Sequence, residues 1–239
     1  MKPPGIAPAP ARMSEPTTGR MYDLWAKFYD HTFGALVRRR QILAIEQLRA
    51  RPGDRGLDIG VGTGMTLRHY PDNITVVGMD LSGGMLSKAA AKVEELGLRR
   101  CRLVQADAMR PPFADHSFDH VVITHTISVV SDPQRLVAWA TRLLKPGGRI
   151  IVLNHFMSPS PVIGWFERVL NPLCVKIGWR SDLSLEECMG GGDLHVQYRF
   201  KMAAFDFWQI VVLGEHEPGV SRSAAAIEEE LPPGARLVM

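Results

Sequence analysis

The sequence predicts an α/β fold in which helices cover both faces of a mostly parallel sheet. Short runs of aliphatic and β-branched residues alternate with helix-length segments through the middle of the chain, as they do where crossover helices join parallel strands. A glycine-rich turn follows the first of these runs, and an aspartate ends each of the next two. A chain of 239 residues can bury one sizeable core, so we expect one such domain.

Seven strands are expected, and the last two have no helix between them. These two are therefore expected to form an antiparallel pair. The expected strands span 56–59, 74–79, 102–106, 118–123, 149–154, 194–201 and 204–213. The helices expected between the first five strands span 65–69, 83–96 and 133–144.

The rest of the chain divides into segments of different character. Residues 1–18 contain five prolines and few core-forming side chains, which indicates a disordered leader. Residues 19–52 carry apolar residues at helical spacing and are expected to form a helical lid on the main domain, 53–214. Within it, 156–192 is too apolar for a linker and is expected to form a helical cap beside the active site, unless part of it is ordinary core. Residues 215–239 are typical of a poorly ordered tail.

The composition excludes several classes of protein. Hydrophobic residues make up 46% of the chain and charged residues 22%, which argues against collagen-like, coiled-coil and wholly disordered chains. No apolar run approaches the roughly 18 to 20 residues that a membrane-spanning helix needs, and the chain begins with no signal-peptide pattern, so we expect a cytoplasmic protein. Its three cysteines lack metal-ligand spacing, which predicts reduced thiols and no metal.

The net charge of +3 conceals a basic region near the N-terminus. Between Arg20 and Arg55 there are eight Arg or Lys residues and four Asp or Glu residues. A basic excess beside apolar residues attracts an anionic membrane surface or a nucleic acid. A solvated helix face is the alternative interpretation of the same charges.

A glycine-rich turn closes the first expected strand. Gly60, Gly62 and Gly64 have the spacing G-x-G-x-G, and Met65 stands where the dinucleotide fingerprint requires its third glycine. The motif for NAD binding therefore fails. A carboxylate at Asp58 would repel a pyrophosphate, but it suits a ligand that carries an ammonium group and hydroxyls. A purely structural turn is the alternative.

Two aspartates follow the next two strands. Asp80 ends the second strand about twenty residues after the turn, where an acidic side chain can accept both hydroxyls of a ribose. Asp107 and the amide of Ala108 follow the third strand, where the edge of an adenine would lie. Each aspartate alone can cap a loop or helix, but the carboxyl ends of parallel strands converge on one crevice. The side chains expected to sandwich the adenine ring are Met79, Leu81 and Met109.

Taken together, these motifs resemble the class I S-adenosylmethionine-dependent methyltransferases over roughly residues 20 to 215. The resemblance implies a Rossmann-like seven-stranded sheet with the last strand antiparallel. It also implies S-adenosyl-L-methionine as cofactor, S-adenosyl-L-homocysteine as product, no metal, and a ribose held by Asp80. The resemblance is carried by the turn from Asp58 to Gly64, by Asp80, by Asp107 and Ala108, by Phe118 and Asp119, and by the segment from Leu144 to Gly148.

Four further segments resemble the soluble bacterial type of phosphatidylethanolamine N-methyltransferase, which is similar in turn to the quinone-biosynthesis C-methyltransferases. The resemblance implies stepwise transfer of up to three methyl groups to the lipid ethanolamine nitrogen, giving phosphatidylcholine. It implies a phospholipid substrate at an anionic membrane surface, and a protein bound peripherally to the inner face of the cell membrane. We expect a monomer and no nucleic-acid partner. The four segments are 21–30, 125–128, 153–156 and 178–182.

The acceptor is expected to meet an aromatic stripe near the N-terminus. On a helix, Tyr22, Trp25 and Tyr29 fall within about 60° of one another. Aromatic faces attract cations, and quaternary ammonium groups in particular. Tyr29 is expected to orient the amine or to stack on the donor, and Tyr22 to close the lid. Trp25 and Phe28 can instead pack into the core.

Three polar residues complete the expected site. His125 and His155 follow the fourth and fifth strands, where either can contact substrate or cofactor or accept the proton that the amine must lose. Arg180 is expected to bind the lipid phosphate in a bidentate manner, with Arg168 and Lys176 as possible helpers.

Other functions remain open at this level. A C-methyltransferase of ubiquinone or menaquinone precursors would keep the same cofactor residues, and a small-amine N-methyltransferase would not need the basic helix. A non-catalytic scaffold would have lost the donor site, whereas the glycine turn and Asp80 are intact. Nucleic-acid methylation is disfavoured because His125, Thr126 and Ile127 stand where an Asn/Asp-Pro-Pro-aromatic motif would be needed.

Overall fold

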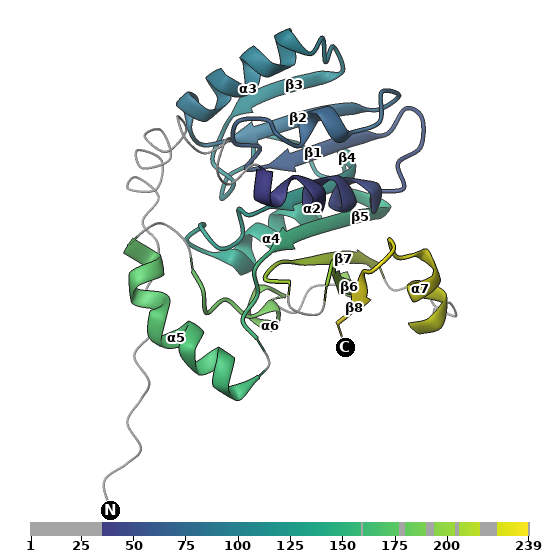
Figure 1. Cartoon of the computed structure of the whole chain (residues 1–239). Helices are drawn as coiled ribbons and strands as arrows, with labels where there is room; N and C mark the ends of the chain where they lie inside the picture. The colour runs from purple at the N-terminus through teal and green to yellow at the C-terminus, as the bar shows by residue number, and fades with distance from the viewer. Residues whose placement is uncertain are drawn as a thin grey trace, which may run out of the picture.

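The computed structural model describes residues 35–158, 160–176, 180–189, 194–203, 206–215 and 224–238. Their strands form one eight-stranded sheet, with the order β3-β2-β1-β4-β5-β7-β6-β8 (Figure 1). The strands are β1 (Arg55–Ile59), β2 (Thr75–Asp80), β3 (Cys101–Gln105), β4 (Phe118–Thr124), β5 (Leu144–Asn154), β6 (Leu194–Lys201), β7 (Gln209–Glu215) and β8 (Arg236–Leu237). The helices are α2 (Ala35–Glu46), the 3-10 helix η2 (Leu67–His69), α3 (Gly83–Glu95), α4 (Pro133–Leu143), α5 (Pro161–Lys176), α6 (Leu185–Cys188) and α7 (Ala224–Glu230).

The pairing of the strands confirms the predicted fold class. Strands β1 to β5 pair in parallel, whereas β7 runs antiparallel to both β5 and β6. The chain moves outward from β1 to β3 and then crosses back to β4, on the other side of β1. Such a reversal leaves a crevice beyond the carboxyl ends of β1 and β4, which is where open α/β sheets bind their ligands.

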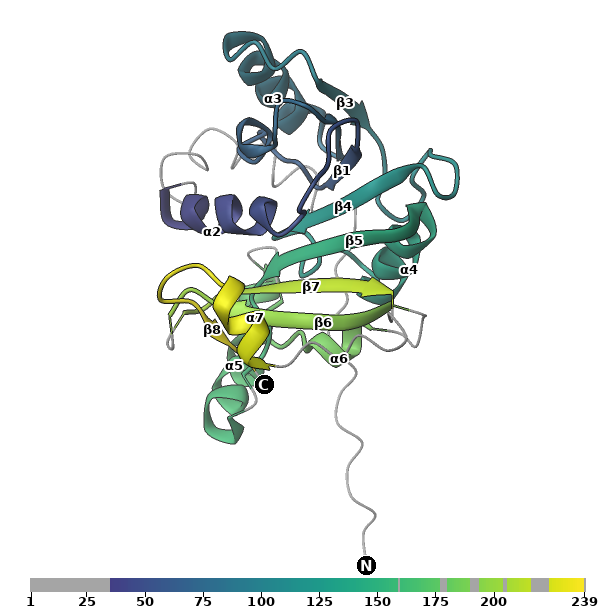
Figure 2. The same ribbon diagram turned by 90° about the vertical axis from the view of Figure 1, so that its right-hand side faces the viewer.

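The central strands are buried on both faces, as their continuous apolar runs predict. Val121 and Ile123 of β4 pack with α4 and α6, whereas Val122 packs with α2 and α3. In β5, Ile150 likewise belongs to the core on the side of α4 and α6, and Ile151 belongs to the core on the side of α2 and α3. Helices α2 and α4 therefore lie on opposite faces of the sheet (Figure 2).

Side-chain caps explain where the two long crossover helices begin. The Ser82 hydroxyl accepts a hydrogen bond from the Met85 amide at the start of α3. The Asp132 carboxylate accepts from the Arg135 amide at the start of α4, and Pro133 occupies the first turn, where its missing N–H costs nothing. The predicted helix at 65–69 is reduced to the 3-10 helix η2. Among the described helices, none has the length and apolarity to cross a membrane.

The predicted poorly ordered tail is wrong for the residues that the structure describes. Helix α7 and strand β8 belong to it, and β8 adds an eighth strand to the expected seven by pairing with β6. Ile227 of α7 is buried in the same core as Phe200 of β6, and Leu231 and Leu237 pack against that core. Ile227 follows three alanines and Leu231 stands between Glu230 and Pro232, so this part of the segment lacks the run of large apolar residues that usually predicts an ordered element.

The tail is expected to contribute to stability. Replacing Ile227 by Ala should lower the free energy of unfolding by about 2 kcal/mol, because it leaves a cavity beside the buried strand β6. Urea denaturation measures the change. The control is Glu228→Ala, which alters an exposed neighbour on the same helix. Equal stability of both variants and the wild type would mean that the tail does not pack on the sheet.

Candidate active site

A cavity of about 140 Å³ lies at the carboxyl ends of the parallel strands. Its walls come from the turn after β1, the end of β2 with the start of α3, and the segments after β3 and β4. Several predicted cofactor residues line it together. These are Gly60, Gly62, Asp80, Leu81, Asp107, Ala108, Met109 and His125, and Met79 also lines the cavity.

The Asp80 carboxylate is held in place by two backbone amides. The Gly62 amide donates to Oδ2 at 2.8 Å, and the Ser82 amide donates to Oδ1 at 2.8 Å. These two hydrogen bonds hold the carboxylate in one orientation at the wall of the cavity. Similarly, the Met109 amide donates to Asp107 Oδ1 at 2.7 Å. Two oriented carboxylates on neighbouring strands suit the hydroxyls and exocyclic amine of a nucleoside.

The glycines of the turn have different tasks. Gly60 has φ +72°, and a Cβ there would collide with the side chain of Thr126. Gly64, which does not line the cavity, has φ +76°, and a Cβ there would lie 3.1 Å from the Ala89 Cβ. Gly60 therefore lets the turn approach Thr126 closely, while Gly64 lets it pack closely on α3.

Asp58 lies beneath the turn and does not line the cavity. Its side chain is fully buried, and its Oδ2 accepts hydrogen bonds from Thr66 Oγ1 at 2.5 Å and from the Tyr70 hydroxyl at 3.1 Å. Burial raises the pKa of Asp58 to about 7, the two hydrogen bonds oppose this, and the nearby charge of Asp80 adds to it. Its Oδ1 has no hydrogen-bond partner among the described residues. The predicted contact of Asp58 with a ligand ammonium group stays a prediction.

His125 forms part of the cavity wall in a strained conformation. Its φ is +58°, a value unusual for a residue other than glycine, and its amide donates to the Leu153 carbonyl at 2.8 Å. Burial and the charge of Arg40 lower the pKa of His125 to about 3. An imidazole with so low a pKa is a weak general base near neutral pH. His125 thus lines the cavity as a neutral imidazole, and both ligand contact and proton transfer stay predictions for it.

His155 joins the end of β5 to the predicted cap and does not line the cavity. Its Nδ1 lies 2.9 Å from the Phe207 carbonyl, its Nε2 lies 3.3 Å from Glu167 Oε1, and its ring stacks on that of Phe207 at 3.7 Å. Burial lowers the pKa of His155, while the hydrogen bond with Phe207 and the charge of Glu167 oppose the shift. These contacts are those of a residue that fixes α5, and its predicted catalytic role is untested.

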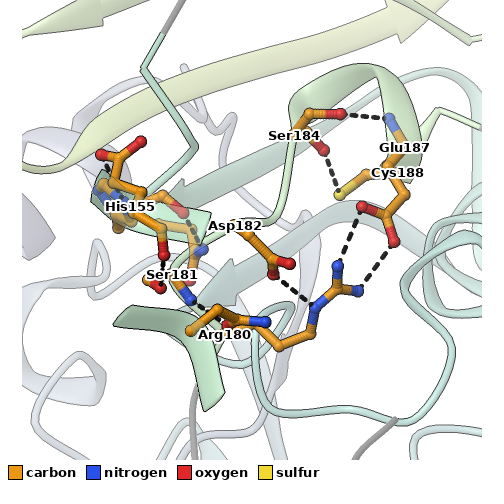
Figure 3. A network of polar contacts seen from close by, with 10 residues as sticks. His155, Arg180, Ser181, Asp182, Ser184, Glu187 and Cys188 are labelled. Carbon is orange, nitrogen blue, oxygen red and sulfur yellow. Dashed lines mark hydrogen bonds and ion pairs between the residues drawn. The ribbon is translucent and has the colours of Figure 1, made fainter. Parts of the chain in front are cut away.

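Arg180 is not the free cation that the sequence led us to expect. Its guanidinium donates to both carboxylate oxygens of Glu187, at 2.8 and 3.1 Å, and to Asp182 at 3.1 Å (Figure 3). Burial alone would lower the pKa of Arg180, but hydrogen bonds with Glu187 and the charge of Asp182 raise it above its usual value. Its backbone amide donates to the Ser128 carbonyl. Arg180 thus ties the cap to the segment after β4, and its bidentate face is occupied by protein carboxylates.

The aromatic residues predicted to receive the acceptor, Tyr22, Trp25 and Tyr29, lie outside the described residues. The structure adds an aromatic pair that the sequence analysis missed. Trp208 meets the ring of His125 edge to face at 6.1 Å, and its neighbour Phe207 stacks on His155. The sequence offered one signal for this pair, because two adjacent aromatic residues stand immediately before strand β7.

A further residue explains why Trp208 holds its place. The Arg40 guanidinium of α2 lies 4.7 Å from the centre of the Trp208 ring and also binds the Asp206 carboxylate, with a closest distance of 2.8 Å. A cation over an aromatic face is favourable, and the paired carboxylate neutralises its charge. This contact fixes the start of β7 against α2, close to the cavity wall at His125.

The buried carboxyl of Asp58 is expected to make stability depend on pH. Its folded pKa of about 7 exceeds the ordinary 3.8, so its contribution is fully present at low pH and is lost as the pH rises towards 7. Asp58→Asn cannot ionise at this position. Between about pH 5 and pH 8, the free energy of unfolding of the wild type should therefore fall by on the order of 2 to 3 kcal/mol relative to that of Asp58→Asn. Asp72→Asn, at a residue 94% exposed, is the control. Parallel pH curves for Asp58→Asn and the wild type would contradict the assignment.

Comparison with known proteins agrees with this geometry. The methyltransferase domain family matches residues 57–152. A phosphatidylethanolamine N-methyltransferase of Cereibacter sphaeroides is 36% identical over 178 residues, which cover 74% of this chain and 87% of that protein. A demethylmenaquinone methyltransferase of Renibacterium salmoninarum is 35% identical over 154 residues, which cover 62% of each protein.

A solved structure shares the fold. The phosphoethanolamine N-methyltransferase 2 of Haemonchus contortus, bound to phosphomonomethylethanolamine and S-adenosylhomocysteine, superposes with a TM-score of 0.55 at 24% identity, over 67% of this chain and 38% of that one. The cavity of the present chain fits an adenosyl group, since the carboxylates of Asp80 and Asp107 are oriented beside Met79, Leu81 and Met109. The chain therefore belongs to the class I S-adenosylmethionine-dependent methyltransferases, with S-adenosyl-L-methionine as its cofactor.

Proposed function

We propose that this enzyme methylates the amine of phosphatidylethanolamine in steps, through the monomethyl and dimethyl lipids, to give phosphatidylcholine. One observation carries the proposal. The phosphatidylethanolamine N-methyltransferase relative is matched over 87% of its length, whereas the quinone methyltransferase relative is matched over 62%. The longer match covers 74% of this chain, compared with 62% for the quinone relative, so it includes more of the chain outside the cofactor half of the fold. The proposal places a monomer at the cytoplasmic face of the membrane.

The cavity residues are suited to hold a donor in one orientation. When bound, the cofactor supplies an electrophilic methyl group on a sulfonium. Asp80 is proposed to accept the ribose hydroxyls, while Leu81 and Met109 enclose the adenine beside Asp107 and Ala108. Fixing the geometry of reacting groups in this way can contribute ~7 to 11 kcal/mol to catalysis.

His125 is proposed to favour two cationic ligands by staying uncharged. With a pKa near 3 its imidazole remains neutral at physiological pH. A neutral ring beside the cavity does not repel the donor sulfonium or a methylated ammonium product, and its unprotonated nitrogen can accept a hydrogen bond from an acceptor amine that still carries an N–H. Tyr22, Trp25 and Tyr29 are proposed to cover the acceptor from the N-terminal segment, with the cation over their rings.

Methylation of a quinone precursor is the second candidate, because the 35% identity to a demethylmenaquinone methyltransferase favours it specifically. The same donor residues would serve, but the acceptor would be a ring carbon. Radiolabelled S-adenosylmethionine offered with phosphatidylethanolamine, its monomethyl and dimethyl forms and demethylmenaquinone separates the two. Label in phosphatidylcholine supports the lipid reaction, and label in menaquinone alone would contradict it.

The donor site has its own test. Asp80→Asn should weaken binding of S-adenosylhomocysteine about tenfold or more, because one of the two ribose acceptors becomes a donor. Isothermal titration calorimetry measures the affinity. Glu95→Gln is the matched control, since it removes one charge at an exposed position of α3. Unchanged affinity of Asp80→Asn would remove Asp80 from the donor site.

A further inference from the structure

Helix α5 presents an apolar face to the outside of the molecule. Seven large apolar side chains on it are each more than half exposed. At 100° per residue they fall within an arc of about 160°, in which the one charged position is Lys176, the last residue of the helix. They are Val162 (64% exposed), Ile163 (53%), Trp165 (56%), Phe166 (54%), Val169 (54%), Leu170 (53%) and Leu173 (61%), and we call them the α5 apolar face.

The opposite side of α5 is polar and faces the protein. Glu167 Oε2 accepts from the Ser158 amide at 2.7 Å, and the Glu167 carbonyl accepts from the Ser181 hydroxyl at 2.8 Å. Asn171, which is 5% exposed, accepts from the Ser181 amide at 3.1 Å. His155 and Ser181 lie together at this junction in Figure 3. This is the reverse of a water-facing surface helix, whose apolar stripe turns inward.

These polar contacts fix the rotation of the helix. If α5 turned its apolar face inward, the buried ends of Glu167 and Asn171 would lose their partners, at a cost of about 1 to 3 kcal/mol for each unsatisfied group. The apolar face is therefore held outward by the contacts beneath it. An exposed apolar patch of this extent marks an interaction surface.

We propose that the α5 apolar face docks on an anionic phospholipid bilayer. The charges of the helix fit this partner. Of its three charged residues, Glu167 turns inward to His155, Arg168 is exposed beside the apolar arc, and Lys176 is the last residue of the helix. A helix that has an apolar face flanked by basic residues, within a chain of net charge +3, has the pattern of one that lies in the plane of an anionic membrane.

The aromatic content of the face fits the same partner. Trp165 and Phe166 lie next to each other with ring centres 5.0 Å apart, in an edge-to-face arrangement. Tryptophan is enriched at membrane interfaces, because its ring is apolar while its N–H remains hydrated. The two rings form the broadest part of the face and are its expected anchors.

The α5 apolar face is connected to the active site. Helix α5 follows β5, whose carboxyl end lies at the same edge of the sheet as the cavity. His155 at that end contacts Glu167 of α5 and stacks on Phe207, and the adjacent Trp208 reaches His125 in the cavity wall. In Figure 1, α5 projects beside the sheet layers. Docking through α5 would therefore bring a lipid headgroup towards the cavity, an arrangement that rests on the proposed lipid function.

Quenching of tryptophan fluorescence by lipids with brominated acyl chains tests the contact directly. Vesicles of phosphatidylethanolamine and phosphatidylglycerol should quench the wild type, and Trp165→Phe should lose much of that quenching while it still binds the vesicles. Trp139→Phe is the matched control, because Trp139 is a half-buried residue of α4 that contacts Arg142. Equal quenching of the wild type and Trp165→Phe would overturn the proposal.

A variant with a weakened face provides the second test. Trp165→Ser combined with Phe166→Ser and Leu170→Ser should lower binding to these vesicles at least about tenfold, with the affinity for S-adenosylhomocysteine unchanged. The control combines Leu96→Ser with Val196→Ser, which removes exposed apolar residues elsewhere. Unchanged vesicle binding would overturn the proposal. So would sedimentation velocity showing a wild-type dimer that the triple variant abolishes, if both proteins bind vesicles equally.

The outcome separates this surface from the proposed function. If the wild type methylates no lipid amine but its vesicle binding still requires the α5 apolar face, the surface stands and the lipid substrate is wrong. If the wild type methylates phosphatidylethanolamine and the triple variant binds and methylates the same vesicles equally well, the substrate stands and the surface is wrong.

Discussion

Parallel pairing of β2, β1 and β4 is the constraint on which the active site depends. It brings the carboxyl ends of these strands to one edge, so residues far apart in sequence share one cavity. The reversal of strand order between β1 and β4 keeps the crossover helices from closing that edge. Backbone hydrogen bonds then fix the orientation of the Asp80 carboxylate, since the amides of Gly62 and Ser82 both donate to it.

The donor half of the site could be predicted from the sequence because its signals are local. Gly60, Asp80 and Asp107 each stand at the end of an apolar strand, and strand ends of a parallel sheet meet. The protein partners of Arg180 and Asp58 could not be predicted, for the opposite reason. Whether a charged side chain is free depends on partners that the sequence does not place beside it, such as Glu187 for Arg180 or Thr66 for Asp58.

Two features of the fold could not be predicted from the sequence, namely the ordered elements α7 and β8 and the rotation of helix α5. Helix α7 and strand β8 each have a single large apolar residue, so their burial near Phe200 depends on the position of β6 and not on local periodicity. For α5, the apolar residues were visible in the sequence, but the sequence does not say which side of a helix faces the protein. The contacts of Glu167 and Asn171 decide it, and they place polar groups inside and apolar groups outside.

Diffraction from crystals grown with S-adenosylhomocysteine tests the central claim, that the strand ends hold the donor, most directly. The account predicts a ligand whose ribose hydroxyls bind the Asp80 carboxylate and whose adenine lies between Leu81 and Met109, next to Asp107. Electron density for the ligand at any other place on the molecule, or a ribose that does not reach Asp80, would contradict it.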